Sequence, residues 1–224
     1  MAEDASVQAA NAAGLAFLKG PVVSGAMSYI DPDIALNGRY SGAFALGQGG
    51  SRPANDDNVA PNQWVPAGYY AAPINEQWSW GVAAFSNFGL VTDYKSDFGG
   101  LALADKSDLK TANLNLNAAY RVNEWVAVGF GFNIVRAEAE LTATVPANTT
   151  LPLPPQLGGP QNLSGRGVAD LSGDDWGYGW NVGLIAEPAE GTRLGLSYRS
   201  SVDLSLEGRA KSELFAGTRS AVNP

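Results

Sequence analysis

The sequence predicts an all-β fold, a transmembrane antiparallel β-barrel with about seven strands in this chain, and three observations predict it. Apolar residues alternate with small or polar residues over long stretches, which is typical of strands that separate two different environments. Several stretches run for about 12 to 18 residues, whereas a soluble strand averages about five or six. Tight turns also alternate with long loops along the chain, which is the pattern of outer-membrane barrels.

The first three predicted strands lie at roughly 21–31, 62–73 and 77–90. A long loop over residues 32–61 separates the first two, and the tight turn Asn75-Glu76 joins the second to the third. The alternation of the third strand breaks within Ser86–Leu90. Glycine in a strand often marks a bulge or kink, so we expect a kink here, although an ordinary strand end would leave the same pattern.

The next two strands follow a second long loop, residues 91–108, and the tight turn Asn123-Glu124 joins them. The fifth strand alternates regularly from Val126 to Ile134, and its apolar phase slips at Ala137, which indicates a bulge or an exit from the membrane. The fourth strand sets apolar residues against asparagines. Its apolar face comprises Ala112, Leu114, Leu116, Ala118, Tyr120 and Val122, and its other face Thr111, Asn113, Asn115 and Asn117.

The last two predicted strands follow the longest loop, residues 143–173, and are joined by the turn Pro188–Gly191. The sixth alternates from Trp176 to Leu184, and the seventh from Leu194 to Leu206. Five tryptophans lie close to the tight turns in this interpretation, where the aromatic girdle of a membrane protein is expected. They are Trp78, Trp80, Trp125, Trp176 and Trp180.

The composition excludes most catalytic chemistry. The 224 residues carry a net charge of −8 and include no cysteine and no histidine. Disulfides, thiolate zinc sites, histidine-dependent triads and histidine-ligated metals are therefore excluded, and we expect no enzyme activity, no metal and no cofactor. An acidic chain without a basic cluster predicts no nucleic-acid partner. The pairs Asp56-Asp57 and Asp174-Asp175 are interpreted as solvated loop charges.

Three other interpretations stay open from the residues alone. One is a soluble, secreted β-sandwich binding module whose core holds the aromatic rings. Another is a general outer-membrane diffusion pore, and a third is a chain without function by itself. The strand lengths, and an inner face built of glycine and asparagine, favour the barrel over the sandwich.

Ten short segments follow one another across nearly the whole chain, and together they resemble a known family. They are Tyr29–Asp33, Asn58–Pro61, Trp64–Pro66, Ala72–Asn75, Ser86–Leu90, Asn113–Asn117, Ala119–Arg121, Gly129–Asn133, Trp176–Asn181 and Ser197–Ser200. No single segment is diagnostic, but the ten in sequence are highly specific. The chain thus resembles the long-chain fatty acid transporter family of Gram-negative outer membranes, which also takes up aromatic hydrocarbons.

The resemblance implies a 14-stranded barrel plugged by an N-terminal hatch, of which this chain would be the N-terminal half. Residues 1–18 would be part of the hatch, and residues 19–224 half of the barrel. The complete protein would be a multi-pass, monomeric protein of the cell outer membrane. Its implied partners are outer-membrane lipid and hydrophobic small molecules, either fatty acids or aromatic hydrocarbons.

The resemblance also implies a route for the ligand. It would be caught among the external loops, enter the barrel and leave sideways into the membrane through a kink in the third strand. The residues that match the kink are Asn87, Phe88, Gly89 and Leu90. Such a route avoids the aqueous periplasm, which is favourable because burying a methylene gains about 0.8 kcal/mol.

The chain also departs from the family pattern at positions that bear on the hatch and on ligand binding. Ala2–Leu18 resembles only the end of the hatch, and Asn11-Ala12-Ala13 stands where the family has Asn-Pro-Ala. A ligand-binding arginine of some members aligns with Ala143 or nearby, so Arg136 and Arg199 are the candidates for polar contacts with a ligand.

The longest loop contains four leucines with two open interpretations. They form either an external apolar patch that catches ligands or part of a flexible, solvated loop. The four are Leu151, Leu153, Leu157 and Leu163. At the start of the sequence, Met1–Asp4 is acidic, which is not the pattern of a signal peptide.

Overall fold

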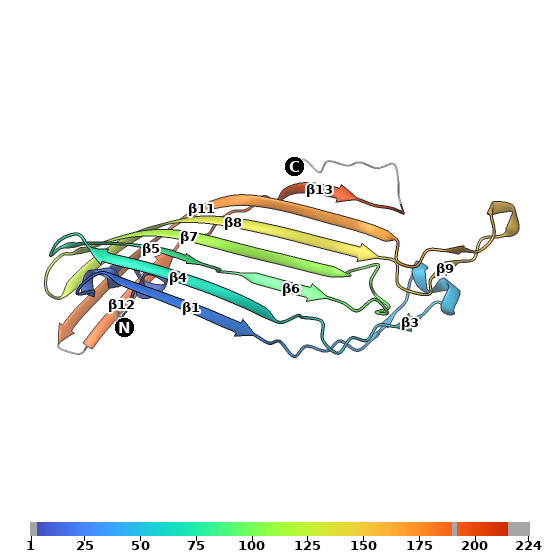
Figure 1. The fold of residues 1–224 in the computed structure, drawn as a ribbon, viewed down its shortest axis with the longest axis horizontal. Coiled ribbons are helices and arrows are strands. Elements are labelled where there is room, and N and C mark those ends of the chain that lie inside the picture. Colours follow the sequence, from blue (N-terminus) through green and yellow to red (C-terminus); the bar gives the residue numbers. More distant parts are fainter. Residues whose placement is uncertain (1–3, 190–191, 215–224) are drawn as a thin grey trace.

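The computed structural model describes residues 4–189 and 192–214. They form one curved antiparallel sheet with the strand order β1-β4-β5-β7-β8-β11-β12, in which β6 pairs with β7 and β13 pairs with β11 (Figure 1). The tight turns gather at one end of the sheet and the long loops at the other (Figure 1). None of the helices in these residues has the length and apolar character to span a membrane. One curved sheet, rather than two packed sheets, contradicts the sandwich interpretation.

The seven strands of this path correspond to the seven predicted ones. The sheet contains β1 (Val22–Ile30), β4 (Gln63–Pro73), β5 (Trp78–Phe85), β6 (Gly89–Asp93), β7 (Lys106–Arg121), β8 (Val126–Thr144), β11 (Gly167–Ala189), β12 (Thr192–Arg199) and β13 (Glu207–Lys211). The loops contain two short pairs, β2 (Arg39–Tyr40) with β3 (Arg52–Pro53) and β9 (Thr150–Leu151) with β10 (Gln161–Asn162). The helices are α1 (Val7–Ala10) and the 3-10 helices η1 (Ala12–Phe17), η2 (Ala43–Gln48) and η3 (Pro155–Leu157).

The strands extend further toward the loops than predicted. β8 has 19 residues and β11 has 23, so the loop between them covers 145–166 rather than 143–173. β7 begins at Lys106, inside the predicted loop 91–108. The prediction followed the apolar alternation, which ends where the outward-facing residues become charged. The backbone ladder continues past that point because its hydrogen bonds do not depend on side-chain polarity.

The outward face carries an apolar band with aromatic side chains at both ends. Trp78 lies beside a tight turn, whereas Trp64 and Trp176 lie toward the loops. Ala186 of β11 pairs with Val126 next to a tight turn, and Trp176 lies ten residues before Ala186 along the same strand. Ten residues span about 33 Å along a strand and about 25 Å at a tilt near 40°, which is the height of a barrel's apolar band. The prediction that Trp176 lies near the tight turns is therefore wrong, because β11 is long enough to place it at the opposite boundary.

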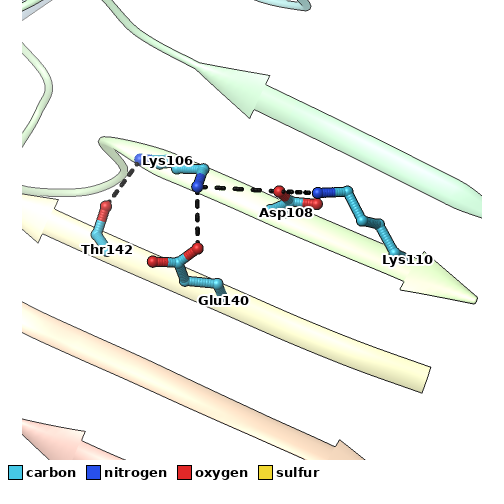
Figure 2. A network of polar contacts seen from close by, with 5 residues as sticks. All are labelled: Lys106, Asp108, Lys110, Glu140 and Thr142. Carbon is cyan, nitrogen blue, oxygen red and sulfur yellow. Dashed lines mark hydrogen bonds and ion pairs between the residues drawn. The ribbon is translucent and has the colours of Figure 1, made fainter. Parts of the chain in front are cut away.

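Charged side chains form a belt on the outward face beyond this band, at the loop end of β7 and β8 (Figure 2). Lys106 Nζ lies 2.9 Å from Glu140 Oε2 and 3.9 Å from Asp108 Oδ2. Lys110 Nζ lies 2.6 Å from the same Asp108 oxygen. The backbone N–H of Lys106 donates to Thr142 Oγ1 at 3.2 Å. Charged groups need water, so this belt marks the level at which the strands leave the apolar zone.

The N-terminal segment covers the inward face of the sheet near the tight turns. Two glycines of that face allow the close approach, since a Cβ at Gly129 would overlap Ala13 and one at Gly183 would overlap Asn11. A buried apolar cluster joins the segment to the sheet. It comprises Ala5, Ala13, Leu15, Ala16, Leu18, Ala71, Ala119, Ala127 and Ile185.

The predicted seventh strand, 194–206, is interrupted. β12 ends at Arg199 and β13 begins at Glu207, and both pair with β11. The intervening residues leave the ladder and turn the side chain of Val202 onto the inward face of β11. A Cβ at Gly177 or Gly179 would overlap that side chain. The apolar residues that predicted a continuous strand here thus pack against glycines instead.

Candidate ligand site at a strand break

The predicted third strand is also interrupted, and here the break has the geometry of a bulge. Phe85 of β5 pairs with Asn113 of β7, and Gly89 of β6 pairs with Lys110. Three residues, 86–88, therefore stand opposite two, which is the one-residue excess of a β-bulge. The break lies within the segment where the sequence predicted a kink.

Thr111 of β7 fixes the break to the sheet. Its Oγ1 accepts a hydrogen bond from the backbone N–H of Phe88 at 3.0 Å and donates to the carbonyl of Phe88 at 2.6 Å. The backbone N–H of Thr111 also donates to that carbonyl, at 3.1 Å. The segment around Phe88 is thus held on β7 and turned away from β4.

The wall is consequently open between β4 and β6. The ladder between β4 and β5 runs only from the pair Gly68–Ala84 to the pair Pro73–Ser79. Beyond it, residues 63–67 of β4 pair with β1 alone among the strands that the structure describes. Two neighbouring cavities occupy this opening, of about 480 Å³ and about 370 Å³. Each is within the size range of small-molecule sites.

The lining of the larger cavity is mostly apolar. Phe88 and Leu90 are 52% and 51% exposed there, and Trp64 lies on the β4 side. Asn87 and Gly89 also line it. The smaller cavity lies toward the tight turns and is lined by Pro66, Ala67, Gly68, Ala84, Phe85, Ser86, Thr111, Ala112 and Asn113.

Gly89 contributes space rather than a special backbone conformation. A Cβ at this position would have Leu109 O as its nearest neighbour, at 3.8 Å, and the backbone of Gly89 is not in the left-handed region. A larger side chain would therefore leave the backbone in place and extend into the open space beside Gly89, at the edge of the cavity that this residue lines.

The structure brings two of the predicted site residues together. Arg199, at the end of β12, reaches across the inward face and donates from Nη1 to Asn87 Oδ1 at 3.3 Å. Its Nη2 donates to the carbonyl of Ala9 in α1 at 2.7 Å, and its guanidinium lies 5.8 Å from the ring centroid of Phe85. Within the described residues no carboxylate lies within ion-pair distance of Arg199, so its charge faces neutral acceptors.

Arg136 lies on the opposite face of the sheet. Its Nε is 2.8 Å from Glu138 Oε1 and its Nη2 is 3.6 Å from Asp174 Oδ2. The guanidinium also stacks over Trp176, 5.3 Å from the ring centroid. Arg136 is thus part of the outward charged belt, with carboxylate partners, and it pairs with Ala112, which stands opposite the break on β7.

The leucines of the longest loop do not share one surface. Leu157 is 66% exposed and Leu151 is exposed, but Leu153 is half-buried and Leu163 is buried. The interpretation as an apolar patch therefore does not hold for all four leucines, because Leu163 is buried.

The paired aspartates are not all solvated loop charges, contrary to prediction. Asp56 is 4% exposed, and its carboxylate accepts hydrogen bonds from the N–H groups of Asn58 and Lys95 at 3.1 and 2.8 Å. Asp174 and Asp175 lie within β11. The buried Asp56 joins the first two long loops at their bases, and nothing in the local sequence indicated this.

Uncharged amide side chains form a cluster on the inward face. The sequence did not predict this cluster, although the alternation placed its members from β7 on one face. Asn117 Nδ2 donates to Gln8 Oε1 of α1 at 3.0 Å, and Gln8 Nε2 donates to the carbonyl of Tyr70 at 3.1 Å. The cluster therefore ties the N-terminal segment to the wall. Its members are Gln8, Asn113, Asn115, Asn117, Asn133 and Asn181, all buried.

Known proteins show the same fold. The structure is similar to the crystal structure of a Pseudomonas aeruginosa FadL homologue, with a TM-score of 0.70 and 18% identity over 93% of this chain and 50% of that one. The Pseudomonas putida toluene transporter TodX gives a TM-score of 0.58 and 19% identity over 92% of this chain and 52% of that one. At sequence identities of 18% and 19%, the structural similarity establishes the fold and nothing more.

The sequence comparisons are more specific. The chain is 36% identical over 220 residues to a long-chain fatty acid transport protein of Salmonella typhi, covering 96% of this chain and 48% of the relative. It is 38% identical over 212 residues to a 47 kDa outer membrane protein of Pasteurella multocida, covering 93% of this chain and 46% of the relative. The chain thus spans about half the length of these relatives. A family model matches residues 1–222, and the chain therefore belongs to the outer membrane protein transport protein family (OMPP1/FadL/TodX).

Proposed function

We propose that the protein containing this chain takes up hydrophobic small molecules, fatty acids or aromatic hydrocarbons, through the outer membrane of a Gram-negative cell. The ligand leaves sideways, through the opening between β4 and β6. One observation carries this proposal, namely that the strand break leaves an apolar, ligand-sized opening in the wall at the loop-side boundary of the apolar band. The names of the relatives, a long-chain fatty acid transport protein and a toluene transporter, support the ligand class.

In this proposal residues 1–18 act as a hatch and residues 19–224 as half of the barrel wall. The N-terminal segment blocks the axial route toward the tight turns. The ring centroid of Phe17 lies 5.2 Å from the guanidinium carbon of Arg121 and 4.7 Å from that of Arg193. Arg121 also donates a hydrogen bond to the carbonyl of Ala16. With the axis closed by these contacts, the opening in the wall is the apolar exit.

Arg199 supplies the polar contact for a ligand carboxylate in this proposal. Its guanidinium lies at the break, and a carboxylate is a stronger partner for it than the two neutral oxygens it now meets. The exit favours the ligand's tail, since each methylene transferred to lipid gains about 0.8 kcal/mol. Asn87 to Leu90, which cover the end of the break and the start of β6, form the gate.

The test fills the opening at Gly89. We expect Gly89→Val to lower uptake of a hydrophobic ligand about tenfold or more, because its side chain occupies the cavity while its backbone stays in place. Uptake is measured in cells that express the gene containing this chain and lack their own transporter, per amount of protein in the outer membrane. Gly25→Val in β1 is the matched control, since a Cβ there has similar room, with its nearest neighbour at 3.9 Å. Unchanged uptake in Gly89→Val would favour a pore without a lateral gate.

A further inference from the structure

The amide cluster has a direction that fixes how each asparagine points. Asn113 Nδ2 donates to Asn133 Oδ1 at 3.0 Å, and Asn133 Nδ2 donates to Asn181 Oδ1 at 2.8 Å. Asn115 Nδ2 donates to the same Asn181 oxygen at 3.0 Å. Because each amide has one donating and one accepting end, this chain commits the NH₂ of Asn113 to the cluster.

The other end of Asn113 is unsatisfied. Its Oδ1 is buried and has no hydrogen-bond partner among the residues that the structure describes, and the residue as a whole is 2% exposed. A buried acceptor without a partner is costly, so such a group in a folded protein calls for an explanation. Asn115, one step along the same face, has both ends satisfied, because its Oδ1 accepts from Asn117 at 2.6 Å.

Asn113 stands at the break in the wall. It pairs with Phe85, the last residue of β5, and it lines the smaller of the two cavities. The rest of that lining is largely apolar, with Pro66 and Ala67 on the β4 side. The cavity is thus a largely apolar space whose wall includes Asn113, the residue with the unpaired acceptor.

We propose that Asn113 Oδ1 accepts a hydrogen bond from the O–H group of a ligand in this opening, either a long-chain alcohol or an undissociated fatty acid. The inference rests on the proposed function, since it takes the opening to be the ligand's path. A hydrocarbon has no donor for this acceptor, and a carboxylate brings only further acceptors. Asn113 therefore favours neutral O–H ligands. A fatty acid that Arg199 holds as a carboxylate on the inward face contacts Asn113 in the smaller cavity only in its protonated form.

The test compares uptake of dodecan-1-ol, dodecanoic acid and dodecane in cells expressing the gene that contains this chain. We expect Asn113→Leu to lower the ratio of alcohol to dodecane uptake about three- to tenfold, the worth of one hydrogen bond. Asn113→Thr keeps an acceptor oxygen and should retain the ratio within about twofold. Asn115→Leu is the matched control: it removes a satisfied amide away from the cavity, and should leave the ratio unchanged even if less protein reaches the membrane.

Dodecanoic acid tests whether the proposal extends from long-chain alcohols to fatty acids. Its uptake by the unaltered protein should fall relative to that of the alcohol as the pH rises from about 5 to about 8, because the undissociated fraction falls, and Asn113→Leu should abolish this advantage at low pH. If the uptake of dodecanoic acid responds neither to pH nor to Asn113→Leu, the claim for fatty acids is wrong. An unchanged alcohol ratio in Asn113→Leu, or an equal change in Asn115→Leu, overturns the proposal altogether. A failure of the proposed lateral route would be seen in a different measurement, because Gly89→Val would then leave dodecane uptake unchanged.

Discussion

Within residues 4–189 and 192–214, the wall is interrupted at residues 86–88 and at residues 200–206, and of these two interruptions the first alone is open. At 86–88 a one-residue bulge stays on β7, and the space it leaves toward β4 is an apolar cavity. At 200–206 the chain keeps one backbone bond to β11, from the N–H of Ser200 to the carbonyl of Trp180, and then leaves the ladder, yet Val202 packs onto Gly177 and Gly179. An interruption in a strand therefore becomes an opening only where no side chain of the same protein fills it.

Arg199 joins the two interruptions. It is the last residue of β12, directly before 200–206, and it donates to Asn87 in the other break. Its second bond, to Ala9, includes the N-terminal segment in the same junction. The open break is thus held on one side by Thr111 of its own neighbour and on the other by a residue from the far part of the sheet.

The largest expected effect concerns the filled interruption. Gly177→Val should lower the free energy of unfolding by about 1–3 kcal/mol, because its side chain overlaps Val202 and overpacks a filled site. Denaturant titration of the detergent-solubilised protein measures this. Gly89→Val is the contrasting variant, which should change stability by less than about 0.5 kcal/mol. Equal destabilisation of the two variants would remove the distinction between a filled and an open break.

A smaller effect is expected where Arg199 meets the open break. Arg199→Met should lower uptake of dodecanoic acid at neutral pH about three- to tenfold, because it removes the charged partner of a carboxylate. Uptake of dodecane should change little, since methionine keeps the apolar stem of the side chain. Equal losses for both ligands would show that Arg199 acts only in holding Asn87 and Ala9.

The sequence predicted the sheet better than it predicted the contacts across it. Alternation placed Asn113, Asn115 and Asn117 on one face, and a glycine located the break, because both signals are local. The contact between Asn87 and Arg199 joins residues far apart in the chain, and no local pattern contains it. The outward position of Arg136 was predictable from the sequence, since Arg136 continues the outward parity that runs from Val126 to Ile134.

The strand ends show the same limit. Val202 belongs to a regular alternation in the sequence, but it packs against glycines of β11 rather than pairing in the ladder. Whether an alternating segment pairs or packs depends on the room beside it, which is set by residues elsewhere in the chain. Small residues opposite a predicted strand are the signal for this, although they become informative only once the pairing is known.

The most direct test of the account closes the open break covalently. The sequence of this chain has no cysteine, and any cysteine encoded elsewhere in the gene is first replaced by serine, so that the introduced pairs are the only thiols of the protein. Val65→Cys with Leu90→Cys places one thiol on each side of the opening, and Tyr69→Cys with Ala83→Cys places two within an existing pair of β4 and β5. A short, reducible bifunctional thiol reagent is applied, and dodecane uptake is measured before and after reduction. The account predicts that cross-linking stops uptake in the first pair alone and that reduction restores it. Uptake that continues through a cross-linked opening would contradict lateral exit between β4 and β6.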